Sequence, residues 1–199
     1  MSEETEEFWT LIRRYERAPD QREEIVARVE ERFRRVVSIL VVDTCGFTRS
    51  VREQGIVPFL MLLERLERVV RPAVEGTGGR IFLREADNFF AIFGHPRDAV
   101  ACGRRILRDV RRLNEGLPVP ERIAVSIGIG YGEVLVVDPD MLYGDEMNLV
   151  CKVGEDLADA DELLLTPAAA HALGDDLGDA EERHFRISGV NVIAYRPPE

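Results

Sequence analysis

The sequence contains little cysteine, little histidine and no long apolar run. Its cysteines, Cys45, Cys102 and Cys151, are odd in number and lack CxxC spacing, which argues against a disulfide framework and a structural zinc site. Its three histidines share no spacing typical of metal ligands. No apolar stretch approaches the roughly 18 residues that a membrane-spanning helix needs. We therefore expect reduced thiols and no segment within a membrane.

Positive charge is also scarce. The chain has 26 Lys and Arg residues against 37 Asp and Glu residues, a net charge of -11. No basic run with interleaved aromatic residues interrupts this balance, so nucleic acid is not an expected partner. The first ten residues lack the basic and apolar regions of a secretory signal, which predicts a cytoplasmic location. Metal ions or a few placed cations would have to attract any small anionic ligand.

The 199 residues fit one domain with an additional helical segment, and we place the boundary between residues 1–35 and 36–199. Two helices are expected before the boundary. The second has an apolar stripe, which consists of Ile25, Val26, Val29, Phe33 and Val36. Two alternatives stay open for this stripe: packing on the domain that follows, or a seam between two chains, although it is too short for a sustained heptad array.

The apolar runs beyond residue 35 predict the order βαββαβ with extensions, an α+β fold of the ferredoxin-like type. The run Val36–Asp43 is rich in β-branched residues, as in a strand buried on both faces. Residues 80–83 and 88–93 predict a hairpin with Asp87 in its tip. The first strand and this hairpin lie side by side in such a sheet, so we expect Asp43 and Asp87 at the same edge.

Four sequence blocks, in this order and spacing, resemble the catalytic domain of class III nucleotidyl cyclases. The blocks are "ILVVDTCGFT", "GGRIFLREADNFFAIF", "VSIGIGYGEVLVV" and "YGDEMNLVCKVGEDL". The resemblance runs from about Val36 to Arg196 and is far more specific than any single block. It implies an enzyme that converts ATP or GTP to a cyclic nucleotide. It also implies a head-to-tail homodimer with its sites at the interface.

The resemblance assigns metal ligation to Asp43 and Asp87, together with the backbone carbonyl of Thr44. Singly, Asp43 reads as a helix N-cap and Asp87 as a turn former. Within the matching blocks, a two-ion site for Mg²⁺ or Mn²⁺ is the better interpretation, with Ca²⁺ as a non-catalytic occupant. The turn Cys45, Gly46, Phe47 and Thr48 matches the loop whose backbone N–H groups cradle phosphates.

The base-reading and cationic positions depart from the family pattern. Leu83 and Met141 occupy positions where relatives use polar residues to read the purine. Asn148 matches the asparagine that orients the ribose, whereas the transition-state arginine is replaced by Lys152, which lacks the bidentate fork. Ser188 also replaces a phosphate-contacting lysine of the family. A milder departure is Ala86, which we expect to exclude the positive φ of the usual glycine.

These departures leave two functional interpretations. The first is a divergent cyclase with altered substrate contacts. The alternative is a catalytically weak or inactive cyclase-homology dimer, which binds a divalent metal ion or a nucleotide as a regulatory module and passes its occupancy on through the N-terminal helices.

Overall fold

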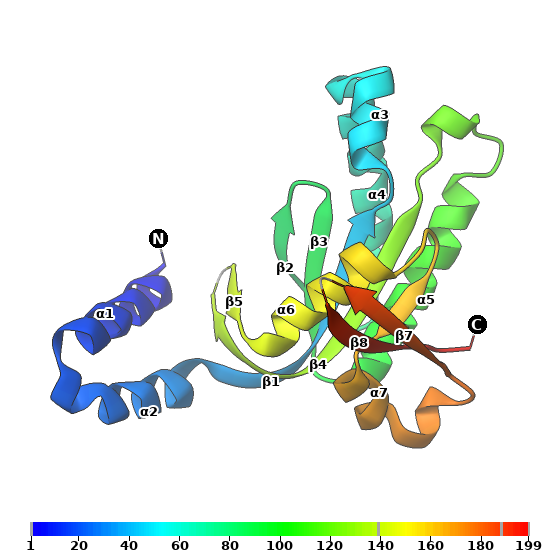
Figure 1. Cartoon of the computed structure of the whole chain (residues 1–199). Helices are drawn as coiled ribbons and strands as arrows, with labels where there is room; N and C mark the ends of the chain where they lie inside the picture. The colour runs from blue at the N-terminus through cyan, green and yellow to red at the C-terminus, as the bar shows by residue number, and fades with distance from the viewer. Residues whose placement is uncertain (1, 139, 188, 199) are drawn as a thin grey trace.

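The computed structural model describes residues 2–138, 140–187 and 189–198. The strands form one mixed sheet in the order β2-β3-β1-β4-β6-β8-β7, with β5 paired to β4. Figure 1 shows this sheet with helices on its faces and two N-terminal helices to one side. This arrangement confirms the predicted α+β class with a ferredoxin-like core.

The elements that carry the predicted site follow the two N-terminal helices in the chain. They are β1 (Arg34–Thr44), α3 (Phe47–Gln54), α4 (Ile56–Gly76), β2 (Arg80–Glu85), β3 (Asn88–Phe93), α5 (Pro96–Leu113) and β4 (Val125–Val137). The later elements are β5 (Met141–Tyr143), α6 (Asp145–Cys151), the π-helix η3 (Lys152–Leu157), β6 (Leu163–Leu165), α7 (Pro167–Leu173), β7 (Glu181–Ile187) and β8 (Val190–Arg196). Short 3₁₀ turns are η1 (Pro19–Gln21), η2 (Val119–Glu121) and η4 (Gly174–Leu177).

Strand β1 lies inside the sheet, between β3 and β4, and its middle residues are buried on both faces. Its side chains alternate, as the pleat requires. Leu40 and Val42 belong to the apolar cluster that includes α4 and α5. Ile39 and Val41 belong to a second cluster, on the face covered by α6. The continuous β-branched sequence of β1 is therefore explained by helices on both sides.

The N-terminal helices α1 (Glu3–Arg17) and α2 (Arg22–Phe33) form a hairpin against the end of β4. Its core contains Phe8, Ile25 and Phe33, which pack with Val137 of β4. Phe8 and Phe33 meet edge to face, with ring centroids 5.2 Å apart. Of the two alternatives for the helical stripe, the structure shows packing on the domain of the same chain.

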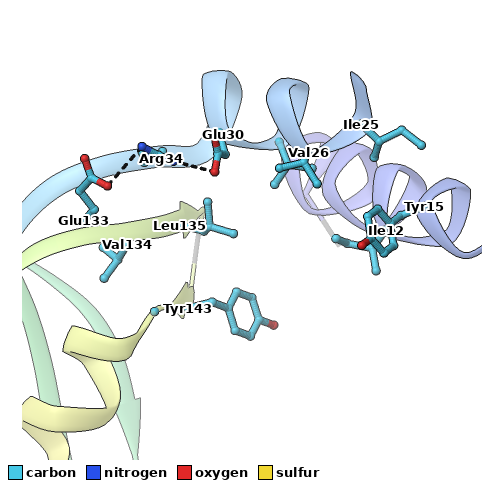
Figure 2. Close-up of a pocket in the computed structure, with 12 residues that line it drawn as sticks. Ile12, Tyr15, Ile25, Val26, Glu30, Arg34, Glu133, Val134, Leu135 and Tyr143 are labelled. Atoms are coloured by element: carbon cyan, nitrogen blue, oxygen red, sulfur yellow. Dashed lines mark ion pairs between the residues drawn. The ribbon is translucent and has the colours of Figure 1, made fainter. Parts of the chain in front are cut away.

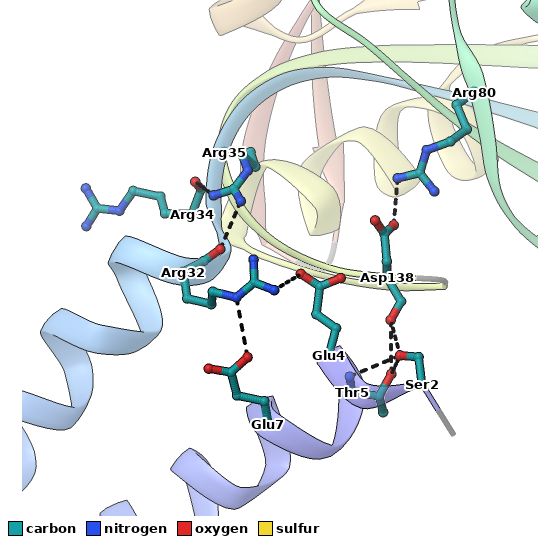
Figure 3. Close-up of polar contacts among 9 residues, drawn as sticks. All are labelled: Ser2, Glu4, Thr5, Glu7, Arg32, Arg34, Arg35, Arg80 and Asp138. Atoms are coloured by element: carbon teal, nitrogen blue, oxygen red, sulfur yellow. Dashed lines mark hydrogen bonds and ion pairs between the residues drawn. The ribbon is translucent and has the colours of Figure 1, made fainter.

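Polar contacts fix this hairpin to the domain, as Figure 3 shows. The hydroxyls of Ser2 and Thr5 donate to the backbone carbonyl of Asp138, at 2.8 and 3.0 Å. The carboxylate of Asp138 pairs with Arg80 at 2.8 Å, and Arg80 begins β2. Arg32 of α2 pairs with Glu7 of α1 at 3.4 Å. One residue, Asp138, thus contacts both helix α1 and strand β2 of the β2–β3 hairpin.

The boundary between helix and strand differs from the sequence expectation. β1 begins at Arg34 rather than Val36, because Arg34 and Arg35 already pair with β4. Val36 lies in the strand and is 51% exposed, so placing it in the helical stripe was wrong. Among the described residues, no helix combines the length and the apolar character that a bilayer crossing requires.

Candidate active site

Two acidic residues lie where two neighbouring strands, β1 and β3, have their adjacent ends. Asp43 is the second-last residue of β1, and Asp87 lies in the turn between β2 and β3. β1 and β3 are antiparallel neighbours, with Val42 opposite Phe89, so the end of one strand lies beside the start of the other. The Thr44 hydroxyl donates a hydrogen bond to Oδ2 of Asp87. The sequence order thus predicted the placement of the pair, whereas the role of the pair as metal ligands stays a prediction.

Holding the two carboxylates of Asp43 and Asp87 close together costs electrostatic free energy when no cation is bound. Asp87 is only 8% exposed. The pKa of Asp43 is raised to about 6, mainly because burial disfavours its charge and then because Asp87 and Glu155 are close. A hydrogen bond from the Thr44 backbone partly opposes this rise. Two carboxylates that lie close together in a partly buried position are typical of a site that binds a cation.

The chemistry of these donors fits a hard divalent ion. Both side chains offer carboxylate oxygens, which Mg²⁺ and Mn²⁺ prefer. The described part of the chain contains no group of three or more His, Cys, Asp or Glu residues placed to hold an ion. Mg²⁺ sites commonly use one or two carboxylates and take their other ligands from water and substrate phosphates. Asp43 and Asp87 therefore fit such an ion, with the carbonyl of Thr44 as the predicted third protein ligand.

The turn that presents Asp87 contains an unusual backbone conformation. Ala86 has a φ of 52°, in the left-handed region that side chains other than glycine rarely adopt. The expectation that Ala86 excludes a positive φ was therefore wrong. The pairing of Glu85 with Asn88 closes a two-residue turn, and this closure imposes the left-handed conformation despite a cost of about 1 kcal/mol.

The predicted phosphate loop leads into helix α3. Gly46 has a φ of 86° and precedes Phe47, the first residue of the helix. The backbone N–H of Cys45 already donates to the carbonyl of Ala124 at 2.9 Å. The first N–H groups of a helix lack partners within it, so residues 46–48 offer the donors that suit a phosphate. A cavity of about 320 Å³ adjoins the loop and is lined in part by Gly46 and Phe47.

The helical turn after β5 carries the other predicted functional residues. Asn148 lies on α6 and is exposed, and among the described residues its side chain makes no hydrogen bond. Lys152 begins η3, and its Nζ donates to Oδ2 of Asp156 at 2.8 Å. Within the described part of the chain, no hydrogen bond or ion pair joins Asn148 or Lys152 to Asp43.

Two glycines place this turn directly on the sheet. A Cβ added at Gly128 of β4 would lie 2.6 Å from the Val150 carbonyl oxygen and 2.7 Å from the Gly154 nitrogen. A Cβ on Gly154 would in turn lie 2.9 Å from the Gly128 nitrogen. Backbone touches backbone here, which only glycine permits. The height of Asn148 and Lys152 above the sheet is therefore fixed by main-chain contact.

The two predicted base-reading residues are not brought together. Leu83 packs in the cluster that includes Phe90 and Leu142. Met141 packs instead against the N-terminal hairpin, in the cluster of Phe8 and Val137. Successive strand residues point to opposite faces, so Leu142, which the sequence analysis did not consider, shares the cluster of Leu83. A role of either residue in purine recognition stays a prediction, and Ser188 lies outside the described residues.

Two residues near the acidic pair escaped the sequence analysis. Nδ2 of Asn88 donates to Oε1 of Glu155 at 3.0 Å. Asn88 directly follows Asp87, and Glu155 lies three residues after Lys152. No local pattern predicts a contact between residues 67 positions apart. This hydrogen bond joins the hairpin tip to the turn that carries Lys152.

A cavity of about 530 Å³ lies between the N-terminal hairpin and the end of β4. Figure 2 shows its apolar walls, which include Ile12, Val26 and Leu135. At its rim Arg34 pairs with Glu30 and Glu133, at 2.6 and 3.2 Å. Arg34 begins β1, whereas Asp43 is near the end of this 11-residue strand. The cavity is therefore not part of the acidic site.

Comparison with known proteins places these features in context. No family model matches the chain. A putative adenylate cyclase 3 from Rhizobium meliloti is 31% identical over 126 residues, which are 63% of this chain and 21% of that protein. The serine/threonine-protein kinase pkn2 from Myxococcus xanthus is 28% identical over 132 residues, 66% of this chain and 16% of that protein. The chain spans about a fifth or less of the length of these relatives.

Solved structures resemble the chain over most of its length. The guanylyl cyclase Cya2 superposes with a TM-score of 0.72 and 22% identity, over 82% of this chain and 92% of that one. At this level of identity the superposition establishes the fold. It confirms the resemblance indicated by the four sequence blocks.

Proposed function

Because the chain has the fold of class III nucleotidyl cyclase catalytic domains, we propose that it converts a nucleoside triphosphate, ATP or GTP, to the 3′,5′-cyclic monophosphate and pyrophosphate. The observation that carries this proposal is the convergence of Asp43 and Asp87 at one sheet edge, with Thr44 bonded to Asp87. A generic domain of this fold gives no reason to hold two carboxylates together in a partly buried place.

The reaction joins the ribose 3′-oxygen to the α-phosphorus and breaks the bond from that phosphorus to the pyrophosphate oxygen. Divalent ions, when bound, lower the pKa of the 3′-hydroxyl and neutralise charge on the triphosphate. Asp43 and Asp87 would hold these ions with the Thr44 carbonyl, while the N–H groups of residues 46–48 would bind phosphate oxygens. The chain thus supplies oxygen ligands for cations and backbone N–H donors for the triphosphate.

The remaining groups come from the turn after β5. Asn148 orients the ribose, and Lys152 places a positive charge near the α-phosphate, where negative charge develops. Asn148 is assigned by its match to the cyclase pattern, and Lys152 by its position in that pattern, where it stands in place of the arginine. In the proposed head-to-tail homodimer, the acidic pair of one protomer faces Asn148 and Lys152 of its partner. Lys152 is a point charge without a planar fork, so we expect a slower enzyme than one with arginine.

One specific observation favours a second candidate function, a dimer that binds metal or nucleotide without efficient turnover. The ammonium of Lys152 is already paired with Asp156 at 2.8 Å, and Leu83 presents no hydrogen-bonding group to a purine. Such a module retains Asp43 and Asp87 for ion binding and passes occupancy to the N-terminal hairpin, which contacts β2 through Asp138 and Arg80.

One assay separates these functions. Purified protein is incubated with ATP or GTP and Mn²⁺, and mass spectrometry measures the cyclic nucleotide. For an enzyme we expect product that disappears in Asp43→Asn and persists in Asp179→Asn, a matched change at an exposed loop carboxylate. No product with either nucleotide across a broad range of protein concentrations contradicts the enzyme. Calorimetric binding of Mn²⁺ in that case supports the binding module.

A further inference from the structure

The hydrogen bond between Asn88 and Glu155 connects two parts of the site that are distant in sequence. Asn88 is the first residue of β3 and follows Asp87 in the hairpin turn. Glu155 lies in the π-helical segment η3, which begins with Lys152. The 3.0 Å bond from Nδ2 to Oε1 therefore links the acidic edge to the turn that presents Lys152.

The amide of Asn88 is oriented so that its nitrogen, and not its oxygen, faces Glu155. Its Oδ1 atom is buried and, within the described residues, has no hydrogen-bond partner. Leaving a buried amide oxygen unpaired costs free energy. The opposite amide orientation would turn this oxygen toward the carboxylate of Glu155, where two acceptors repel each other. The charge-assisted bond to Glu155 thus determines how Asn88 is held.

The carboxylate of Glu155 also contributes negative charge at the acidic edge. After burial and the charge of Asp87, the charge of Glu155 raises the pKa of Asp43. Burial, followed by the charges of Asp156, Asp87 and Glu85, raises the pKa of Glu155. Glu155 does not complete a three-residue ligand cluster among the described residues. A charged group that lies beside a set of direct ligands attracts a cation from outside that set, as a hydrogen-bonded second layer does.

We propose that Glu155 is a positioning residue that couples ion binding at Asp43 and Asp87 to the placement of Lys152. Its charge strengthens ion binding, and its hydrogen bond to Asn88 holds the turn that carries the lysine. The coupling to Lys152 rests on the proposed function. In a head-to-tail dimer, the lysine of one chain serves the site opposite its own acidic pair, so the Asn88–Glu155 bond links the two sites.

A calorimetric titration with Mn²⁺ tests the electrostatic part without any need for turnover. Glu155→Gln keeps a carbonyl acceptor for Asn88 but removes the charge, and we expect about tenfold weaker Mn²⁺ binding. Asn88→Ala keeps the charge, and its affinity should stay within about twofold of the wild type. Glu24→Gln, an exposed change on α2, is the matched control. Equal affinity in Glu155→Gln and the wild type overturns this part.

Kinetics at saturating Mn²⁺ test the positioning part. We expect kcat about tenfold lower in Asn88→Ala and in Glu155→Ala, with little change in Glu155→Gln. Adding Lys152→Ala to Asn88→Ala should cost less than Lys152→Ala costs alone, because the bond acts through the lysine. Fully additive losses overturn this coupling. Absence of product in the wild type defeats the proposed function, while the Mn²⁺ titration still decides the role of the Glu155 charge.

Discussion

Replacing Asp43 by asparagine should stabilise the protein in the absence of metal ions, even though it removes a proposed functional group. The pKa of Asp43 is raised from 3.8 to about 6, chiefly by burial and by the charge of Asp87. A shift of about two units corresponds to about 3 kcal/mol. Asp43 is only partly buried, so screening by solvent reduces the expected gain to about 1–1.5 kcal/mol. Asparagine keeps an oxygen acceptor for the Thr44 backbone.

The assay is thermal unfolding at pH 7.5 with EDTA, where this gain corresponds to a Tm about 3–5 °C higher than that of the wild type. Folded Asp43 holds its proton more tightly than the unfolded chain does. Its penalty is therefore absent below about pH 4 and develops as pH rises through about 6. The Tm difference between variant and wild type should accordingly shrink toward zero as the pH falls from 7 to 4.

Metal ions should reverse the sign. Mn²⁺ at 100 times its dissociation constant stabilises the wild type by about 2.7 kcal/mol, and Asp43→Asn should lose this increment. Asp179→Asn is the control for a change of net charge. The contrary result is an Asp43→Asn protein whose Tm in EDTA is equal to or below that of the wild type, while the control is unchanged. That result refutes the conclusion that the acidic pair destabilises the folded protein when no cation is bound.

Three further changes test other parts of the structure by chemical unfolding and enzyme assay. Gly128→Ala places a methyl group against the Val150 carbonyl and Gly154, so we expect a loss of about 2 kcal/mol and displacement of the turn that carries Lys152, measured as lower activity; unchanged stability contradicts the close backbone contact. Ala86→Gly should stabilise by about 0.5 kcal/mol, because relief of the positive φ exceeds the entropic cost of glycine; a loss of stability argues against the left-handed turn. Phe33→Ala empties a fully buried position and should cost about 3–5 kcal/mol; a loss below about 1 kcal/mol shows that the hairpin is not docked as described.

The sequence predicted those features that burial or strand order determines. The β-branched run after residue 35 predicted the central strand, because helices on both faces leave no polar side to alternate with. The order of strand and hairpin predicted that Asp43 and Asp87 share an edge. The four cyclase-like blocks predicted the fold, which the structural comparison confirmed.

Other features depended on tertiary context that no local pattern encodes. The strand starts at Arg34 because β4 pairs with it. Ala86 adopts a positive φ because two paired strands enforce the turn. The face assignment at β5 required knowing which of Met141 and Leu142 meets the N-terminal hairpin, and an offset of one residue exchanges the two faces. Glu155 was missed because its partner is 67 residues away.

The N-terminal hairpin also has a protective role for the sheet it touches. Its inner surface covers Val137 and contacts Leu135 and Met141, at the place where β5 pairs with β4. A shortened chain that starts at Arg34 would expose these apolar side chains to water, and a contiguous exposed apolar patch favours association between copies of a chain. The first 33 residues should thus be retained when the domain is isolated, because they limit its self-association.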